Sequence, residues 1–278
     1  MGLSDNQIKF FADYIQKELG IVYSPAVYFQ LEQRIEKIAQ FFGWANAEEV
    51  YRKALSQGIT GDFKQYLLDI ATNNETSFFR DPKVWNAFEK IILPGLQVSQ
   101  PKSFSYRIWC TAASFGQEPY SIAMLVHEFL KKNPGHPRIE IIASDIADHA
   151  LKRCKEGRYT QLEVQRGLGA QRLIQYFNND GDGFWSLKPE IKNMVDFRKQ
   201  NLLEPFLGLG TFNIISCRYV LIYQDGEKKK EIIKRLEKTL SPSGMLILGA
   251  SESALGISGD LQQTIISEGV IGYKKADQ

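Results

Sequence analysis

Along the first 71 residues, apolar side chains recur every three or four positions. This spacing places them on one face of a helix and predicts four amphipathic helices. The predicted helices cover residues 6–19, 26–42, 47–57 and 61–70. In the second helix we place Phe29, Arg34 and Phe41 on the inward face. We therefore expect residues 1–71 to form an all-helical N-terminal domain with short connections.

The pattern breaks in the next segment, which we interpret as a linker over residues 72–105. It starts with a polar stretch, continues with the aromatic pair Phe78-Phe79, and then shows helical spacing over residues 83–93. We expect this helix to stop near Pro94-Gly95, since proline and glycine both interrupt helices. A polar connection over residues 97–105 is expected to follow.

From residue 106 to residue 278, short apolar strands alternate with amphipathic helices. The expected strands cover residues 106–111, 139–144, 195–199, 212–217 and 245–249, and a closing hairpin joins 263–266 to 270–273. The expected helices cover residues 118–132, 147–155, 170–176 and 227–240. Turns are predicted at 178–183, within a small hairpin, and at 241–244. This alternation indicates an α/β domain over residues 106–278.

The candidate chemistry starts where the first strand of this domain ends. Small residues over 111–116 separate that strand from a helix with Pro119 in its first turn, which brings backbone N–H groups close to a ligand. Asp145 ends the next strand, where an acidic residue can hold the hydroxyls of a ribose. The two features favour a cofactor that contains adenosine. They leave open whether it is a dinucleotide or S-adenosylmethionine.

Composition narrows the class of protein. The net charge is +2, which does not suggest a nucleic-acid partner. The N-terminus lacks a secretory pattern, and no apolar run approaches the roughly 20 residues needed to span a bilayer. The three cysteines are widely separated, so we expect buried thiols and no metal site. We therefore expect a cytoplasmic protein that is not inserted in a membrane.

Several segments together resemble one known family. They are NETSFFRD at 74–81, EPYSIAM at 118–124, ASDIADHAL at 143–151 with the later GRY, and FNIISCRYVLIY at 212–223. In this order, after a helical domain, they resemble the CheR family of chemotaxis receptor methyltransferases. The resemblance implies a Rossmann-like methyltransferase domain with a small inserted β-subdomain, which we place at about 170–194. It also implies S-adenosylmethionine as methyl donor, S-adenosylhomocysteine as product, and glutamate side chains of membrane chemoreceptors as acceptors.

The resemblance further implies which residues form the site. Arg80 and Tyr223 take catalytic roles, with Tyr223 near the transferred methyl group. Cofactor contacts are implied for Asn74, Thr76, Arg80, Glu118, Asp145, Asn201, Leu202, Arg218, Tyr219 and Val220. Glu118 can meet the cofactor's ammonium group or favour the helix N-terminus, and Arg80 can instead pair with Asp81. The family usually has asparagine at the position of Tyr219, so only its backbone can reproduce that contact.

Three other functions remain to be weighed. A nicotinamide-dependent oxidoreductase is disfavoured because residues 111–116 lack the G-x-G-x-x-G pattern. A nucleic-acid methyltransferase is disfavoured by the absence of a basic stripe. A signalling module that binds the cofactor or its product without turnover stays open because of Tyr219. We expect a monomer that meets the cytoplasmic domains of chemoreceptors mainly through its helical domain, with Arg34 and Lys37 facing an acidic helix.

Overall fold

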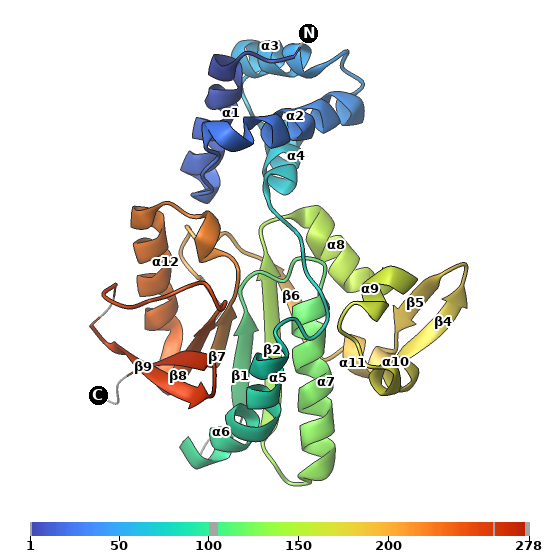
Figure 1. The fold of residues 1–278 in the computed structure, drawn as a ribbon, viewed down its shortest axis with the longest axis vertical. Helices are drawn as coiled ribbons and strands as arrows, with labels where there is room; N and C mark the ends of the chain where they lie inside the picture. The colour runs from blue at the N-terminus through green and yellow to red at the C-terminus, as the bar shows by residue number, and fades with distance from the viewer. Residues whose placement is uncertain (1, 100–104, 258, 276–278) are drawn as a thin grey trace.

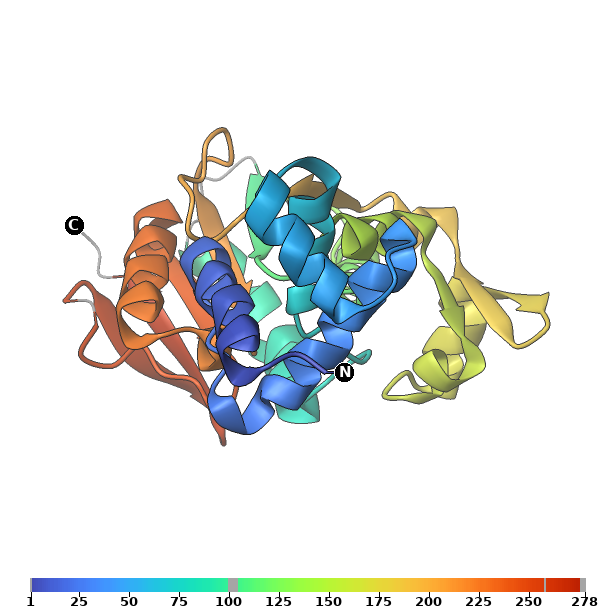
Figure 2. The same ribbon diagram turned by 90° about the horizontal axis from the view of Figure 1, so that it is seen from above.

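The computed structural model describes residues 2–99, 105–257 and 259–275. Its main body is a seven-stranded sheet covered by helices, with the N-terminal helices stacked above it (Figure 1). Seen from above, a small three-stranded sheet projects from one side of the body (Figure 2). The protein is thus a mixed α/β structure with a helical N-terminal part, as the sequence predicted.

The four N-terminal helices confirm the predicted ones. They are α1 (Asp5–Leu19), α2 (Tyr28–Phe42), α3 (Ala47–Gln57) and α4 (Gly61–Ala71), with the short 3-10 helix η1 (Pro25–Val27) before α2. Their apolar faces meet in one core that includes Phe11, Ile15, Leu31, Ile35 and Leu67, all fully buried or nearly so. This core is separate from the cores of the sheet, so the helical part has its own packing.

Two inward placements in α2 were wrong, those of Phe29 and Phe41, whereas Arg34 does face inward. Phe29 is 58% exposed and Phe41 is 61% exposed, since α2 packs against the other helices on one side only. The ring of Phe41 stacks on Tyr66 at the surface. Arg34 donates to the carbonyl oxygens of Ile70 (2.6 Å) and Thr72 (3.0 Å), which satisfies the C-terminal end of α4. Arg34 is therefore bound within the domain and cannot face a partner helix, whereas Lys37 is exposed.

The linker contains more helix than predicted. Helix α5 (Pro82–Ala87) runs into the π-helical turn η2 (Phe88–Ile92) and then into α6 (Leu93–Ser99). The predicted stop at Pro94-Gly95 is wrong, because Pro94 falls in the first turn of α6, where a missing N–H does no harm. The predicted polar connection over 97–105 is helical up to Ser99, and its residues 100–104 lie outside the described residues.

All seven strands of the large sheet were predicted. They are β1 (Ser105–Cys110), β2 (Arg138–Asp145), β6 (Val195–Lys199), β7 (Phe212–Cys217), β8 (Leu240–Leu248), β9 (Leu261–Ser267) and β10 (Val270–Lys275). The turn predicted at 241–244 is wrong, because these residues lie inside β8. The pairing of β8 with β7 shifts register between Leu240 and Met245, and Ser243 has a φ of 56°, so the extra residues form an irregularity in the strand.

Alternation along the strands explains the two faces of the sheet. In β1, Tyr106, Ile108 and Cys110 point into one core, and Trp109 points into the other. Helix α7 (Gln117–Lys132) packs on the first face, and α12 (Gly226–Thr239) packs on the second. Helix α8 (Asp148–Glu156) follows β2. The helix predictions for 118–132, 147–155 and 227–240 are confirmed to within a residue or two at their ends.

The small sheet contains the predicted hairpin and one strand that was missed. Strands β4 (Phe177–Gly181) and β5 (Phe184–Leu187) form the hairpin, and β3 (Arg158–Thr160) pairs with β5. A strand of three residues is too short to show a pattern of its own. Helices α9 (Gln161–Gln165), α10 (Ala170–Tyr176) and α11 (Pro189–Lys192) surround this sheet.

The strand order of the large sheet determines where a ligand can bind. It is β6-β2-β1-β7-β8-β10-β9, and β6, β2, β1, β7 and β8 run parallel. The chain moves outward from β1 through β2 to β6, then returns to β7 and moves out the other way. This reversal leaves a crevice between β1 and β7 at the carboxyl ends of the strands, where open α/β sheets bind their ligands.

Candidate functional site

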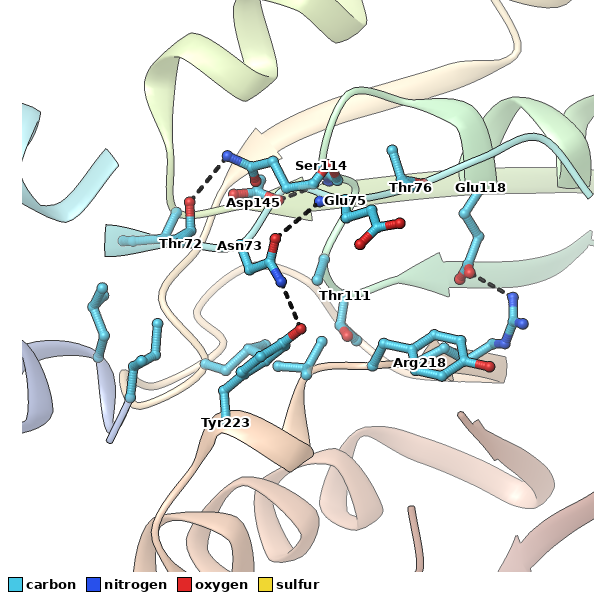
Figure 3. Close-up of a pocket in the computed structure, with 18 of the residues that line it drawn as sticks. Thr72, Asn73, Glu75, Thr76, Thr111, Ser114, Glu118, Asp145, Arg218 and Tyr223 are labelled. Carbon is cyan, nitrogen blue, oxygen red and sulfur yellow. Dashed lines mark hydrogen bonds and ion pairs between the residues drawn. The ribbon is translucent and has the colours of Figure 1, made fainter. Parts of the chain in front are cut away.

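A cavity lies at this crevice, beneath the helical domain. It holds about 960 Å³, counting its open mouth, which is the size of a small-molecule site. Its walls come from the linker after α4, the loops after β1, β2, β6 and β7, and the first turn of α7. Leu19 at the end of α1 and Ile21 just after it complete the lining. Figure 3 shows how the labelled side chains from these segments gather around the cavity.

The structure brings all the site residues predicted from the sequence to this one cavity. Its lining includes Asn74, Thr76, Arg80, Glu118, Asp145, Asn201, Leu202, Arg218, Tyr219, Val220 and Tyr223. They come from segments spread over 150 residues of the chain, which only the fold can bring together. The contacts that each makes with a cofactor stay predictions.

Asp145 fixes the turn that follows β1. Its carboxylate accepts the backbone N–H of Ser114 at 2.8 Å and that of Ala147 at 3.0 Å. Burial raises the pKa of Asp145 to about 6, although these backbone hydrogen bonds lower it. Ser114 has a φ of 50°, which the bond from its N–H to Asp145 helps to hold. Asp145 thus shapes the site even before any ribose contact.

The turn after β1 requires glycine at position 116, where a side chain would collide with two aromatic residues. Gly116 has a φ of 94°, and a Cβ there would lie 2.9 Å from the hydroxyl of Tyr159 and 3.1 Å from the ring of Tyr120. No other residue fits this position without moving both aromatic rings. The hydroxyl of Ser114 donates to the carbonyl oxygen of Asn74 at 2.9 Å and so ties the turn to the linker.

Arg218 is the buried centre of the site. Its guanidinium donates to Glu118 at 2.6 Å, to Asp81 at 2.6 Å and to the carbonyl oxygen of Arg80 at 2.9 Å. Burial alone would lower the pKa of Arg218, but the two carboxylates raise it above its ordinary value. The side chain is 1% exposed and stays a cation. It joins the linker, the start of α7 and the end of β7.

Arg80 lies against an aromatic ring instead of a carboxylate. Its guanidinium sits 3.8 Å from the ring centroid of Tyr219, so the suggested ion pair with Asp81 is wrong; Asp81 pairs with Arg218. Tyr219 has a φ of 59°, a conformation that asparagine tolerates better than tyrosine. Its hydroxyl donates to Asp81. The stacking and this bond offset the backbone cost of a tyrosine where the family usually has asparagine.

Tyr223 is oriented from the linker and from the helical domain. The side-chain amide of Asn73 donates to its hydroxyl oxygen at 2.8 Å (Figure 3). The N–H of Val22 donates to its carbonyl oxygen at 3.0 Å. Asn201 donates to the carbonyl oxygen of Glu18 at 3.0 Å. The end of α1 therefore closes the cavity from above.

A carboxylate of the helical domain caps a helix of the sheet domain. Asp69 of α4 accepts the backbone N–H groups of Asp148 (3.0 Å) and His149 (3.4 Å), the first residues of α8. His149 also lies 3.2 Å from the side-chain amide of Asn74. Burial would raise the pKa of Asp69, but hydrogen bonds from His149, Gln65 and Asp148 bring it below the ordinary value. Asp69 thus couples the two domains beside the cavity.

Sequence reasoning missed several supporting residues, above all Glu252 in the loop after β8. Its carboxylate accepts backbone N–H groups of the segment that lines the cavity after β7. The sequence rule that identified Asp145 could also have identified Glu252, because both are acidic residues at or shortly after the end of a buried parallel strand. The partners Asn73 and Asp69 carried no comparable signal.

The cavity suits an adenosine-containing cofactor with an amino-acid moiety. Three polar atoms of its lining are buried without a partner among the described residues: Oγ1 of Thr111, Nε of Arg218 and Oε1 of Gln224. Asp145 and Glu118 add two carboxylates, one on each side of the turn after β1. A ligand with hydroxyl and ammonium groups would satisfy donors and acceptors that the protein leaves available.

Comparison with known proteins then decides the family. Residues 74–269 match the family model described as CheR methyltransferase, SAM binding domain. The chain belongs to the CheR methyltransferase family. A chemotaxis protein methyltransferase of Pseudomonas putida is 35% identical over 95% of this chain and 96% of its own length. Those of Pseudomonas aeruginosa (34% identical, 98% of both chains) and Escherichia coli (30%, 91% of this chain and 86% of its own) are similar too.

Membership in the CheR family confirms the resemblance seen in the sequence. The cofactor is S-adenosylmethionine, and the protein is an S-adenosylmethionine-dependent methyltransferase. The oxidoreductase alternative is thereby excluded. Among the described residues, no helix is both long and apolar enough to cross a membrane.

Proposed function

We propose that this CheR protein methylates glutamate side chains in the cytoplasmic domains of membrane chemoreceptors, as a cytoplasmic monomer, and forms glutamyl methyl esters. The observation that carries the proposal is the meeting of all the predicted site residues at one cavity between β1 and β7. The names of its relatives, chemotaxis protein methyltransferases, support methyl transfer in chemotaxis, and the resemblance to the family supports glutamate side chains as acceptors.

The acceptor chemistry explains the composition of the site. A glutamate carboxylate has an ordinary pKa of about 4.3, so at neutral pH it is already the nucleophile and needs no general base. Bound S-adenosylmethionine supplies a methyl group on a positively charged sulfur, and its transfer to a carboxylate oxygen leaves a neutral thioether. The protein's task is then to align the acceptor and exclude water, for which alignment alone can contribute roughly 7–11 kcal/mol.

Arg80 and Tyr223 are the residues we assign to this alignment. The guanidinium of Arg80 lies at the cavity and can attract a carboxylate, while the ring of Tyr219 limits how it moves. The hydroxyl oxygen of Tyr223 accepts from Asn73, so its own proton stays available to donate into the cavity. Glu118 is held by Arg218 and by the hydroxyl of Ser216 at 2.7 Å, and offers its carboxylate to the cofactor's ammonium group.

Transfer of a labelled methyl group tests the proposal. Purified protein, labelled S-adenosylmethionine and receptor-containing membranes should yield labelled receptor, and mild base should release the label as methanol. Membranes whose receptors carry glutamine or alanine at the accepting glutamates provide the control. Binding of S-adenosylhomocysteine without any transfer would favour the signalling-module alternative.

A further inference from the structure

Glu252 makes an unusual set of contacts for a buried carboxylate. The residue is 8% exposed, and its Oε2 accepts the N–H groups of Tyr219 (2.7 Å) and Gly249 (2.8 Å). Its Oε1 accepts the N–H groups of Val220 (2.9 Å), Leu221 (2.7 Å) and Ile222 (3.2 Å). No lysine, arginine or histidine in the described part of the chain forms an ion pair with it. All the hydrogen bonds that Glu252 accepts in the described part of the chain come from backbone N–H groups.

These donors belong to the segment that carries the predicted chemistry. Residues 219–222 follow β7 and run into the 3-10 helix η3 (Leu221–Tyr223). Their four consecutive N–H groups converge on one side chain. Such convergent backbone amides form a nest that suits an anion. The same segment places Arg218, Tyr219, Val220 and Tyr223 along the cavity, whereas Glu252 itself does not line it.

We propose that Glu252 is a positioning residue for methyl transfer, acting through the backbone of residues 219–222 on Tyr223 and Arg80. Glu252 acts on Arg80 through Tyr219, because the guanidinium of Arg80 stacks on the Tyr219 ring. Tyr219 has a φ of 59°, and the bond from its N–H to Glu252 holds this conformation. The inference rests on the proposed function. A carboxylate is required because both of its oxygens accept. The NH₂ group of a glutamine would have to face backbone N–H groups, which are donors as well. These would be the N–H groups of Tyr219 and Gly249 in one orientation of the amide, and those of Val220–Ile222 in the other.

Two variants disturb this contact from opposite sides. Glu252→Gln keeps the shape of the side chain and removes one acceptor oxygen. Gly249→Ala keeps the carboxylate, but the new Cβ would lie 2.8 Å from Oε2 of Glu252 and 3.0 Å from the backbone N of Tyr219, and so displaces both. The matched control is Glu163→Gln. Glu163 also accepts a backbone N–H, that of Thr160 at 2.8 Å, but it does not line the cavity.

The measurements are kcat, acceptor KM, calorimetric affinity for S-adenosylhomocysteine, and Tm, each on the full-length protein. We expect both variants to lower kcat about 100-fold, the effect of a misplacement of about 1 Å, and to change KM and cofactor affinity much less. Glu163→Gln should keep kcat within about twofold, even if its Tm falls as far as the Tm of Glu252→Gln or Gly249→Ala. Such a split separates positioning from a general loss of stability.

The proposal fails if folded Glu252→Gln and Gly249→Ala keep wild-type kcat. Should Glu252→Gln not fold, Gly249→Ala decides alone by the same criterion. A wild-type protein that transfers no methyl group to receptors would instead refute the proposed function. In that case the affinity of Gly249→Ala for S-adenosylhomocysteine still shows whether this contact shapes the cavity.

Discussion

Replacing Arg218 by methionine removes the cation between Asp81 and Glu118. Three hydrogen bonds of 2.6, 2.6 and 2.9 Å are lost at a side chain that is 1% exposed. Removing one partner of a buried ion pair typically costs roughly 3–5 kcal/mol, because the other charge stays buried. The side chains of Asp81 and Glu118 are 31% and 15% exposed, so water recovers part of this cost. We therefore expect a loss near 3 kcal/mol, the lower end of that range.

Urea unfolding at neutral pH measures this loss. The control is Arg138→Met, whose side chain is 78% exposed and lies 3.8 Å from Glu140, and which should change stability by less than about 0.5 kcal/mol. Arg218→Lys should fall between wild type and methionine, since an ammonium cannot reproduce the planar fork.

A double-mutant cycle identifies the cause. Glu118→Gln combined with Arg218→Met should cost less than the sum of the two single changes, because the double variant buries no unpaired carboxylate at position 118. A loss below about 1 kcal/mol for Arg218→Met, or strict additivity in the cycle, would refute the argument that the buried cation holds this site together.

Three further predictions concern the cavity and the domain contact. Tyr223→Phe should leave S-adenosylhomocysteine affinity unchanged and lower kcat roughly fivefold, the effect of one hydrogen bond of about 1 kcal/mol made in the transition state. Asp145→Ala should weaken calorimetric affinity by more than about tenfold, and wild-type affinity should fall as the pH drops below about 6, where Asp145 becomes protonated and stops accepting from a ribose. Unchanged affinity in a folded variant would remove Asp145 from ribose binding. Asp69→Asn should lower Tm at neutral pH. Because the folded pKa of Asp69 lies below its ordinary value of 3.8, the wild-type advantage holds above that value and disappears as the pH falls through the folded pKa. Equal Tm values at neutral pH would contradict this coupling.

Local pattern was enough to predict most elements of this protein. Helical spacing predicted α1 to α4, and apolar runs predicted every strand of the large sheet. These signals are local, since a helix or strand buries one face whatever it packs against. The local rules failed at two places. Residues 241–244 form an irregularity inside β8, whose flanking residues Leu240 and Met245 both pair with β7. The helix of the linker continues through a π-helical turn into α6, which includes Pro94 in its first turn.

Some features of the candidate site could be predicted from local sequence, and others could not. The turn after β1 and the acidic end of β2 could be found from sequence alone, because both follow directly from a strand and its neighbours in the chain. The resemblance to the CheR family supplied the linker residues and the segment after β7. No local pattern, however, indicates that Arg218 reaches Asp81 across 137 positions, or that Arg80 stacks on Tyr219.

The same limit applies to Glu252 and Asp69, which act on backbone groups of segments far from them in the chain. A side chain's hydrogen-bond partner depends on where distant backbone groups end, and every buried group must find one. The sequence alone therefore determined most of the elements and the class of cofactor. The tertiary structure decided which charges neutralise one another, which carboxylates hold loops instead of ligands, and how the helical domain closes the cavity.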